Sequence, residues 1–427
     1  MNLTYLLSIM LVLVCFWLSF RDNKTSKYAT TVFMLDTFCS SSKLVKTFIG
    51  HNDFVYSIDY ATFDSYQFIC SGSEDKTVRV WDVETSKQIK ILYGHLSFVS
   101  CVKFSPYHYH NNRRNVICSS SADKTIRFWD VKNNQQFQIF NGHTCHVYGI
   151  EFSPFNSGRY LCSGSYDNTI RLWDVKTSNL LHVFNGHKYA VCCVDFSPLQ
   201  SSTNNNGSNS IGVIGGNGYT ICSGSYDNTI RIWDIETAKQ LLVFKGHEHL
   251  VRSVKYGPNE VRGNGGSNTI LSGSRDKSVR LWDIQSGKQI QVFNRHAHTV
   301  TCVAYSPFIV NNIKFGCDST VICSGSSDKT IRFWDIRSNK KELYVINGDD
   351  KDGRVLCLKF LQIKRKPICV IVRPRVLFVF GDNLFNSFPF KLSNINIFIT
   401  NYCNKQIERK KYIYNIMLVD AKKKKKI

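Results

Sequence analysis

One phrase of residues recurs six times in the middle of this 427-residue chain. Each copy ends in Trp-Asp, and successive copies are 44 to 60 residues apart. The first copy reads SGSEDKTVRVWD, and the later copies vary little from it. A unit of this size cannot bury a hydrophobic core alone, so repeated units must stack on their neighbours. The chain is therefore predicted to form an array of such units, although its length alone would suggest two or three domains.

Each unit is predicted to contain four short β-strands. In the second unit these are Val99–Phe104, Val116–Cys118, Thr125–Trp129 and Gln136–Phe140, where apolar residues dominate or alternate and turn-forming residues lie between them. The spacing from each of the first five tryptophans to the next repeat histidine is constant at 14 residues, whereas the spacing from histidine to tryptophan varies from 30 to 46. Insertions are therefore expected between the first and second strands, the longest being 199–218.

A Gly-His pair precedes five of the units, and Arg295-His296 stands before the sixth. With Ser-Gly-Ser-x-Asp and Trp-Asp, these motifs resemble the WD-repeat (WD-40) family, whose units form four-stranded blades of a β-propeller. The resemblance covers roughly residues 43–360. It implies an all-β, seven-bladed WD-repeat β-propeller, with six full repeats and a shared, degenerate closing blade. A six-bladed or incomplete ring is the alternative.

The closing blade is expected to draw on both ends of the repeat region. Residues 43–49 resemble a fourth strand without a preceding Trp-Asp, and 354–360 resemble a first strand. Residues 368–372 and 376–380 could supply the remaining two strands, although no Trp-Asp follows them. The chain is accordingly divided into an N-terminal segment (1–42), the propeller (43–360) and a basic tail (361–427) that can complete the seventh blade.

The resemblance also implies a hydrogen-bonded His–Ser–Asp–Trp set in each repeat. A buried indole N–H and a turn aspartate each need a partner, and a serine hydroxyl and an imidazole can link them. The six sets are His51, Ser71, Asp75, Trp81; His95, Ser119, Asp123, Trp129; His143, Ser163, Asp167, Trp173; His187, Ser223, Asp227, Trp233; His247, Ser272, Asp276, Trp282; and His296, Ser324, Asp328, Trp334.

This structural role accounts for the recurring histidines, because a catalytic triad would not need six copies. The sequence contains no phosphate-binding loop, zinc-protease motif or hydrolase nucleophile motif. We therefore expect no enzymatic activity, no cofactor and no metal site. The cysteines recur at equivalent positions of different units, too far apart to pair, so free buried thiols are expected.

Two positions vary between repeats and are candidates for recognition: the residue before each turn aspartate, and the residue five places after each histidine. By resemblance, both line the face around the central channel, where family members bind peptides. Aromatic residues and arginine are favoured at interaction hot spots. Ordinary surface variation is the alternative explanation. The predicted partner-binding residues are Tyr56, Tyr148, Tyr166, Tyr226, Arg252 and Arg275.

The net charge of +22 is concentrated in the tail, where residues 361–427 contribute +12 and end in a run of five lysines. Such a run suits nucleic acid or an anionic membrane, and a solvated terminus is the simpler alternative. Residues 3–20 are uncharged and mostly apolar, which is long enough for a transmembrane helix. A membrane anchor with the propeller in the cytosol, a cleaved signal and a non-inserting extension all remain open.

These features together predict a scaffold or adaptor without enzymatic activity. It would bind proteins or peptides through the propeller face and assemble multiprotein complexes in the cytoplasm or nucleus. The alternative is a nucleic-acid-associated WD-repeat subunit that uses the basic tail.

Overall fold

The computed structural model describes residues 33–34, 42–64, 66–198, 219–258, 268–310, 319–336, 342–348, 353–363, 366–373 and 376–382. They lie almost entirely within one compact unit that ends at Gly381. Among them, no helix is long and apolar enough to cross a membrane. The anchor predicted for residues 3–20 and the lysine run at the end of the tail fall outside the described residues.

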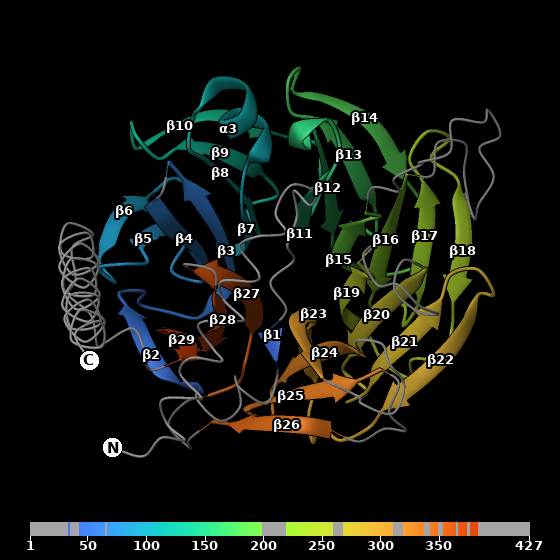
Figure 1. Cartoon of the computed structure of the whole chain (residues 1–427). Helices are drawn as coiled ribbons and strands as arrows, with labels where there is room; N and C mark the ends of the chain where they lie inside the picture. Colours follow the sequence, from blue (N-terminus) through green and yellow to red (C-terminus); the bar gives the residue numbers. More distant parts are fainter. Residues whose placement is uncertain are drawn as a thin grey trace, which may run out of the picture. The chain divides into compact units, whose positions relative to one another are not determined.

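The described repeats are built almost entirely of antiparallel β-strands, as predicted. Each of the six repeats contributes four strands, in chain order, to one sheet, and Figure 1 shows these sheets following one another around a common centre. The first three sheets are β3 (Val55–Phe63), β4 (Tyr66–Ser73), β5 (Val78–Asp82), β6 (Gln88–Leu92); β7 (Val99–Phe104), β8 (Val116–Ser121), β9 (Ile126–Asp130), β10 (Gln135–Phe140); and β11 (Val147–Phe152), β12 (Tyr160–Ser165), β13 (Ile170–Asp174), β14 (Asn179–Phe184).

The next three sheets repeat this arrangement. They are β15 (Val191–Phe196), β16 (Thr220–Ser225), β17 (Ile230–Asp234), β18 (Gln240–Phe244); β19 (Val251–Tyr256), β20 (Thr269–Ser274), β21 (Val279–Asp283), β22 (Lys288–Phe293); and β23 (Val300–Val310), β24 (Ser319–Ser326), β25 (Thr330–Asp335), β26 (Glu342–Asn347). Of its four strands, the first strand of each repeat lies nearest the centre (Figure 1) and contacts the first strand of the neighbouring repeat.

A further sheet joins the two ends of the repeat region. Its order is β2 (Ser42–Ile49), β29 (Val376–Asp382), β28 (Lys366–Arg373) and β27 (Cys357–Ile363). Strand β27 crosses residue 360, where the sequence placed the start of the tail, and β28 and β29 lie beyond it, at the two strands predicted for 368–372 and 376–380. Strand β27 also begins three residues later than the predicted first strand at Arg354. The antiparallel pairing of β27, β28 and β29 sets these bounds, since β27 pairs with β28 from Cys357 to Ile363 and these residues carry no repeat motif.

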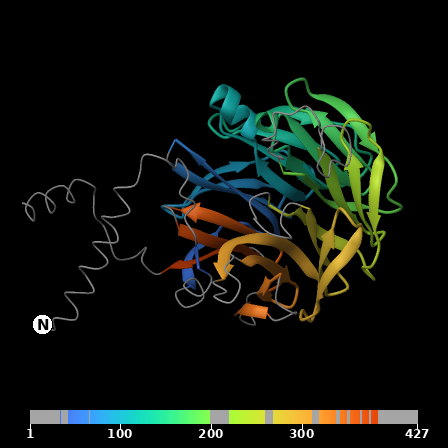
Figure 2. The ribbon, with the colours of Figure 1, turned by 45° about the vertical axis from the view of Figure 1, so that its right-hand side comes forward.

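Three further elements were not predicted. The two-residue strand β1 (Phe33–Met34), in the segment expected to be a linker, pairs in parallel with β23. The insertion between β7 and β8 contains a short helix, α3 (Pro106–Asn112), which Figure 2 shows at the edge of that sheet. Proline suits the first turn of a helix, but seven residues are too few for a helical periodicity to stand out in the sequence. A single 3-10 turn (Asn156–Gly158) lies in the next repeat.

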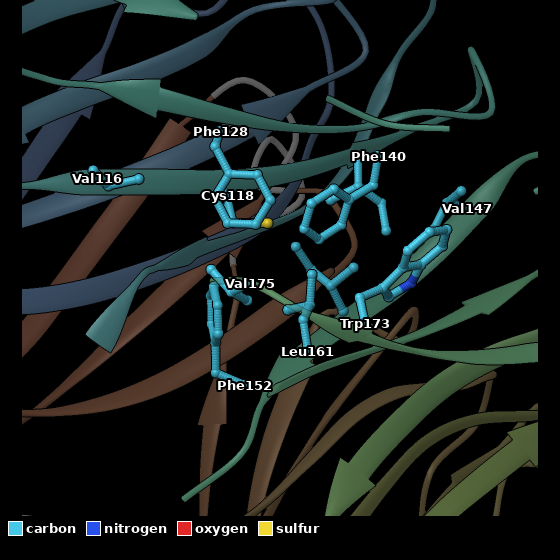
Figure 3. Close-up of a cluster of buried hydrophobic side chains, with 11 residues drawn as sticks. Val116, Cys118, Phe128, Phe140, Val147, Phe152, Leu161, Trp173 and Val175 are labelled. Carbon is cyan, nitrogen blue, oxygen red and sulfur yellow. The ribbon is translucent and has the colours of Figure 1, made fainter. Parts of the chain in front are cut away.

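The hydrophobic core lies between adjacent sheets. Figure 3 shows one cluster in which Val116 and Phe128 of the second repeat pack with Leu161 and Trp173 of the third. Each such cluster buries side chains from two repeats, so neither repeat has a complete core by itself. This sharing explains why the units must stack.

The glycine of the Ser-Gly-Ser phrase allows this close stacking. A Cβ atom placed on Gly72 would lie 2.7 Å from Cγ1 of Val99 in the next repeat, which is too close for real atoms. Ser120 occupies the equivalent position in the second repeat, and its buried hydroxyl has no hydrogen-bond partner among the described residues.

The His–Ser–Asp–Trp set is hydrogen-bonded in every repeat. In the first, Trp81 Nε1 donates to Ser71 Oγ at 2.8 Å, and His51 contacts Ser71 Oγ at 2.7 Å and Asp75 Oδ2 at 2.8 Å. The same three contacts recur in the other five repeats at 2.7 to 2.9 Å. One assignment of protons satisfies every atom: the indole donates to serine, serine to Nε2, and Nδ1–H to aspartate.

This assignment requires a neutral imidazole and an ionised carboxylate. Burial lowers the pKa of the His51 imidazole below its usual value of 6.5, outweighing the opposite effect of Asp75. Burial alone would raise the pKa of the Asp75 carboxyl, but hydrogen bonds from His51 and Thr77 lower it well below its ordinary value. The same directions hold for four further pairs, His95–Asp123, His143–Asp167, His187–Asp227 and His247–Asp276.

Adjacent serines in the second repeat provide a matched test of this set. We expect Ser119→Ala to lower the free energy of unfolding by about 2 kcal/mol, because it leaves Trp129 Nε1 and His95 Nε2 without a buried partner. Ser120→Ala removes a hydroxyl that has no partner, so it should change the free energy by no more than about 0.5 kcal/mol. Urea unfolding followed by tryptophan fluorescence measures both variants. Equal losses would show that the hydrogen bonds of Ser119 carry no special weight.

Acidification should destabilise the protein well before its carboxylates are protonated. The unfolded histidines bind protons near pH 6.5, whereas the buried ones bind them only at lower pH, so the unfolded state gains protons first. Each of the five histidines should then remove up to roughly 1 kcal/mol per pH unit below that value. His108 and His146, whose pKa burial lowers to about 4, act in the same direction.

The urea midpoint at about pH 7.5, 6.5 and 5.5 tests this expectation. It should fall further between the last two values than between the first two, because the unfolded histidines are only half protonated at about pH 6.5. A midpoint that stays constant down to about pH 5.5 would contradict the neutral-histidine assignment.

Candidate binding face

The inner strand of every repeat carries a β-bulge near its start. Its register slips at one residue in each case, and a bulge of this kind re-aims a side chain out of the regular sheet. The residues skipped by the pairing are Tyr56, Ser100, Tyr148, Cys192, Arg252 and Thr301. These six residues lie five places after the repeat histidines, at a position where the residue type differs between repeats. Each repeat therefore directs one variable side chain away from its sheet at the same bulge.

The second variable position lies beside the first. The backbone N–H of Tyr166 donates to the His146 carbonyl oxygen at 2.8 Å, which ties the Ser-Gly-Ser-x-Asp turn to the residues just before the inner strand. Glu74, Ala122, Tyr226, Arg275 and Ser327 make the corresponding bond in the other repeats. In the first repeat the two positions touch directly, because Tyr56 OH donates to Glu74 Oε2 at 2.7 Å.

Three of the predicted tyrosines come together on this face. The ring centroids of Tyr148, Tyr166 and Tyr226, here called the tyrosine cluster, lie 6.0 to 6.3 Å apart. The hydroxyls of Tyr148 and Tyr226 are hydrogen-bonded at 3.2 Å. Tyr166 is 51% exposed, so the cluster presents an aromatic surface to solvent.

Two residues that the sequence did not single out connect the cluster to Tyr56. The His146 ring packs on Tyr148 at 3.9 Å between centroids and on Phe98 at 4.8 Å, and Phe98 packs on Tyr56 at 5.7 Å. Both residues lie three places after a repeat histidine, a position that also varies between repeats. Comparing that position across repeats could have found them.

The two predicted arginines differ in their surroundings. Arg252 is partly buried, with the Cys192 thiol as a hydrogen-bond partner and Tyr148 and Tyr226 close enough to affect its pKa. Arg275 is exposed, and its described contact is the backbone bond from its N–H to the Leu250 carbonyl oxygen at 3.0 Å. Among the residues that the structure describes, no side-chain contact joins Arg275 to the tyrosine cluster.

A ring of charged residues on the inner strands was also missed by the sequence analysis. Lys103 Nζ lies 2.6 Å from Glu151 Oε2, and Lys255 Nζ lies 3.2 Å from the same oxygen and 2.7 Å from Asp195 Oδ1. The basic residues Lys103, Lys255 and Lys359 lower the pKa of the Glu151 carboxyl, although burial alone would raise it. In five repeats a charged residue lies eight places after the histidine, which is the sequence signal for this ring.

The described cysteine and acidic side chains form no disulfides and no cluster that could hold a metal ion. The described cysteine thiols are free, and burial raises the pKa of the Cys70, Cys118, Cys162 and Cys222 thiols well above the ordinary value. Within the described ranges, no group of three or more His, Cys, Asp or Glu residues is placed to hold a metal ion.

Comparison with curated proteins finds short stretches of similarity. The chain is 41% identical over 69 residues to nuclear distribution protein PAC1-1 of Uncinocarpus reesii, covering 16% of this chain and 15% of that protein. It is 32% identical over 90 residues to mitochondrial division protein 1 of Kluyveromyces lactis, covering 21% and 12%. It is 32% identical over 92 residues to GID complex subunit 7 of Schizosaccharomyces pombe, covering 20% and 18%. The match thus spans less than a fifth of each of these relatives.

The family model described as WD domain, G-beta repeat matches six consecutive segments, at residues 42–82, 86–130, 134–174, 178–234, 238–283 and 287–335. These segments contain more than half of the chain, and each spans the outer strand of one sheet and the first three strands of the next repeat. Propellers of this family generally bind proteins and are typically non-catalytic. The chain therefore belongs to the WD-repeat β-propeller family.

Proposed function

We propose that this protein is a non-enzymatic scaffold or adaptor. Its inner-strand face would bind segments of partner proteins and so assemble multiprotein complexes. The observation that carries this proposal is the tyrosine cluster, which gathers three large aromatic rings where Tyr166 is half exposed. Clustered tyrosines offer a large contact area with few rotatable bonds, which favours protein recognition.

The blade itself does not require tyrosine at these positions. The place of Tyr166 and Tyr226 is taken by Glu74, Ala122 and Ser327 in other repeats, with the same backbone hydrogen bond. The residues of the His–Ser–Asp–Trp set, in contrast, are the same in every repeat. The blade does not require these tyrosines, yet they cluster on one face, which supports a role in binding.

Other parts of the functional hypothesis concern regions outside the described residues. The rival function, a nucleic-acid-associated subunit, depends on the lysine-rich end of the tail. We propose a cytoplasmic or nuclear location, which the free thiols of the described cysteines support, since such compartments keep thiols reduced. The membrane anchor at residues 3–20 stays a prediction.

Two exposed tyrosines of the full-length protein allow a controlled test of the binding face. We expect Tyr166→Ala to remove most partner proteins from an affinity purification analysed by mass spectrometry, because it truncates the exposed ring of the cluster. The matched control is Tyr66→Ala, since Tyr66 is 66% exposed and begins β4, at the opposite end of that strand from the turn. Both variants should unfold like the wild type. Identical partner lists from Tyr166→Ala and the wild type would refute the proposed binding face.

We further propose that β2, β27, β28 and β29 form a seventh blade that closes the ring. Strand β27 contacts both β23 of the sixth repeat and β3 of the first. A Cβ atom on Gly325 would lie 2.7 Å from Cγ1 of Val355, the same relation that Gly72 has to Val99 between two full repeats. Lys359 Nζ lies 2.7 Å from Asp59 Oδ1 in the first repeat. These contacts support closure by a blade without a Trp-Asp motif.

Removal of the Lys359 ammonium tests this closure. We expect Lys359→Met to lower the free energy of unfolding by about 1 kcal/mol, because it leaves the buried Asp59 carboxylate without its ion pair while Lys359 itself is partly exposed. Hydrogen exchange of the β27 amides should also become faster. Lys87→Met, at an exposed lysine, serves as the control. If the wild-type β27 amides exchange like those of an unfolded chain, the ring is not closed by this sheet.

A further inference from the structure

Arg252 and Arg280 lie in the same repeat but differ in their partners. Arg280, in the same repeat, contacts Asp276 Oδ2 at 3.4 Å and donates to Gln289 Oε1 at 2.7 Å. The groups that most affect Arg252, apart from its burial, are Cys192, Cys193, Tyr148 and Tyr226. Among the described residues, Arg252 takes part in no ion pair.

The neighbours of Arg252 carry no compensating negative charge at neutral pH. Burial raises the pKa of the Cys192 thiol and of the Tyr148 hydroxyl far above neutrality, and that of the Cys193 thiol to about 12. A partly buried guanidinium surrounded by neutral groups is unfavourable, since it gives up hydration without gaining an ion pair.

The carboxylates on the nearest inner strands are already engaged. Glu151 on β11 and Asp195 on β15 both bind Lys255, and Asp195 also accepts the Tyr256 N–H at 2.9 Å. Glu74, on the opposite part of the face, accepts the Tyr56 hydroxyl. The described residues therefore supply no counter-charge for Arg252, so a bound ligand would have to supply it.

We infer that Arg252, with the tyrosine cluster beside it, anchors a carboxylate side chain from an acidic segment of a partner protein. This inference rests on the proposed binding face and specifies the chemistry of its ligand. A guanidinium can hold both oxygens of a carboxylate in one plane. Only one proton is used in the hydrogen bond between the Tyr148 and Tyr226 hydroxyls, so the other hydroxyl can also donate to the ligand. The three rings would cover the stem of the bound side chain.

Pools of labelled octapeptides test the inference without knowledge of the natural partner. One central position is fixed as Glu, Gln, Lys or phosphoserine, and the remaining positions are randomised. We expect the wild-type protein to bind the Glu pool about tenfold more tightly than the Gln pool and to reject the Lys pool, with fluorescence anisotropy as the readout. Arg252→Met should abolish the difference between Glu and Gln. A preference for Lys or for phosphoserine over Glu would overturn the assignment to a carboxylate ligand.

Stability distinguishes a ligand-binding role from a structural one. Arg252→Met removes an uncompensated charge, so its thermal midpoint should equal or exceed that of the wild type. Arg280→Met, which breaks an existing ion pair in the same repeat, should lower the midpoint and keep the preference for Glu. A lower midpoint for Arg252→Met would show that the arginine serves the fold and would overturn the inference. If Tyr166→Ala loses partner proteins while Arg252→Met keeps them all, the binding face stands and the acidic ligand is excluded.

Discussion

The structure depends on one short chain of hydrogen bonds, from tryptophan through serine and histidine to aspartate, that is built into each repeat. It links the third strand, the second strand, the loop before the first strand and the turn after the second strand. The aspartate also fixes the turn itself, since Asp75 Oδ1 accepts the Thr77 N–H and hydroxyl at 3.0 and 2.6 Å. The polar side-chain atoms of this network are largely buried, and each has a hydrogen-bond partner. Loss of one of the four residues therefore leaves a neighbouring residue without its partner. This explains why the motif residues recur without change.

The same constraint marks where variation is allowed. Once the network has fixed the turn and the loop, the residue before the aspartate needs only its backbone N–H, and the bulged residue on the inner strand is held by its neighbours. Glu74, Ala122 and Tyr166 can therefore occupy equivalent places without altering the blade. Repetition thus separates two kinds of position: those that build a blade, and those at which one blade can differ from the next. The tyrosine cluster and Arg252 belong to the second kind.

The sequence could predict the features that lie within one repeat, but not those that depend on contacts between repeats. The strands, the turns and the His–Ser–Asp–Trp set repeat within some 40 residues and could be recognised by comparing one unit with another. The contacts between repeats could not be found in that way. Lys103 and Glu151 are 48 residues apart, and comparing the units shows that a charge recurs at their position but not which residues pair. Phe98 and His146 likewise acquire a role only when adjacent repeats bring their rings together. The ends of β27, β28 and β29 were misjudged because pairing, and not a motif, defines them.

The geometry of the face also bears on how tightly it can bind. Its side chains project from bulges and turns that the hydrogen-bond network holds in place, so little backbone ordering should accompany binding. Tyrosine adds a large surface with only two side-chain torsions to fix, and the contacts among Tyr148, Tyr166 and Tyr226 restrict even these. A charge set among such rings is partly shielded from water, which strengthens its attraction for an oppositely charged group. A rigid aromatic surface with one uncompensated guanidinium therefore suits selection of a ligand by charge more than by a long sequence.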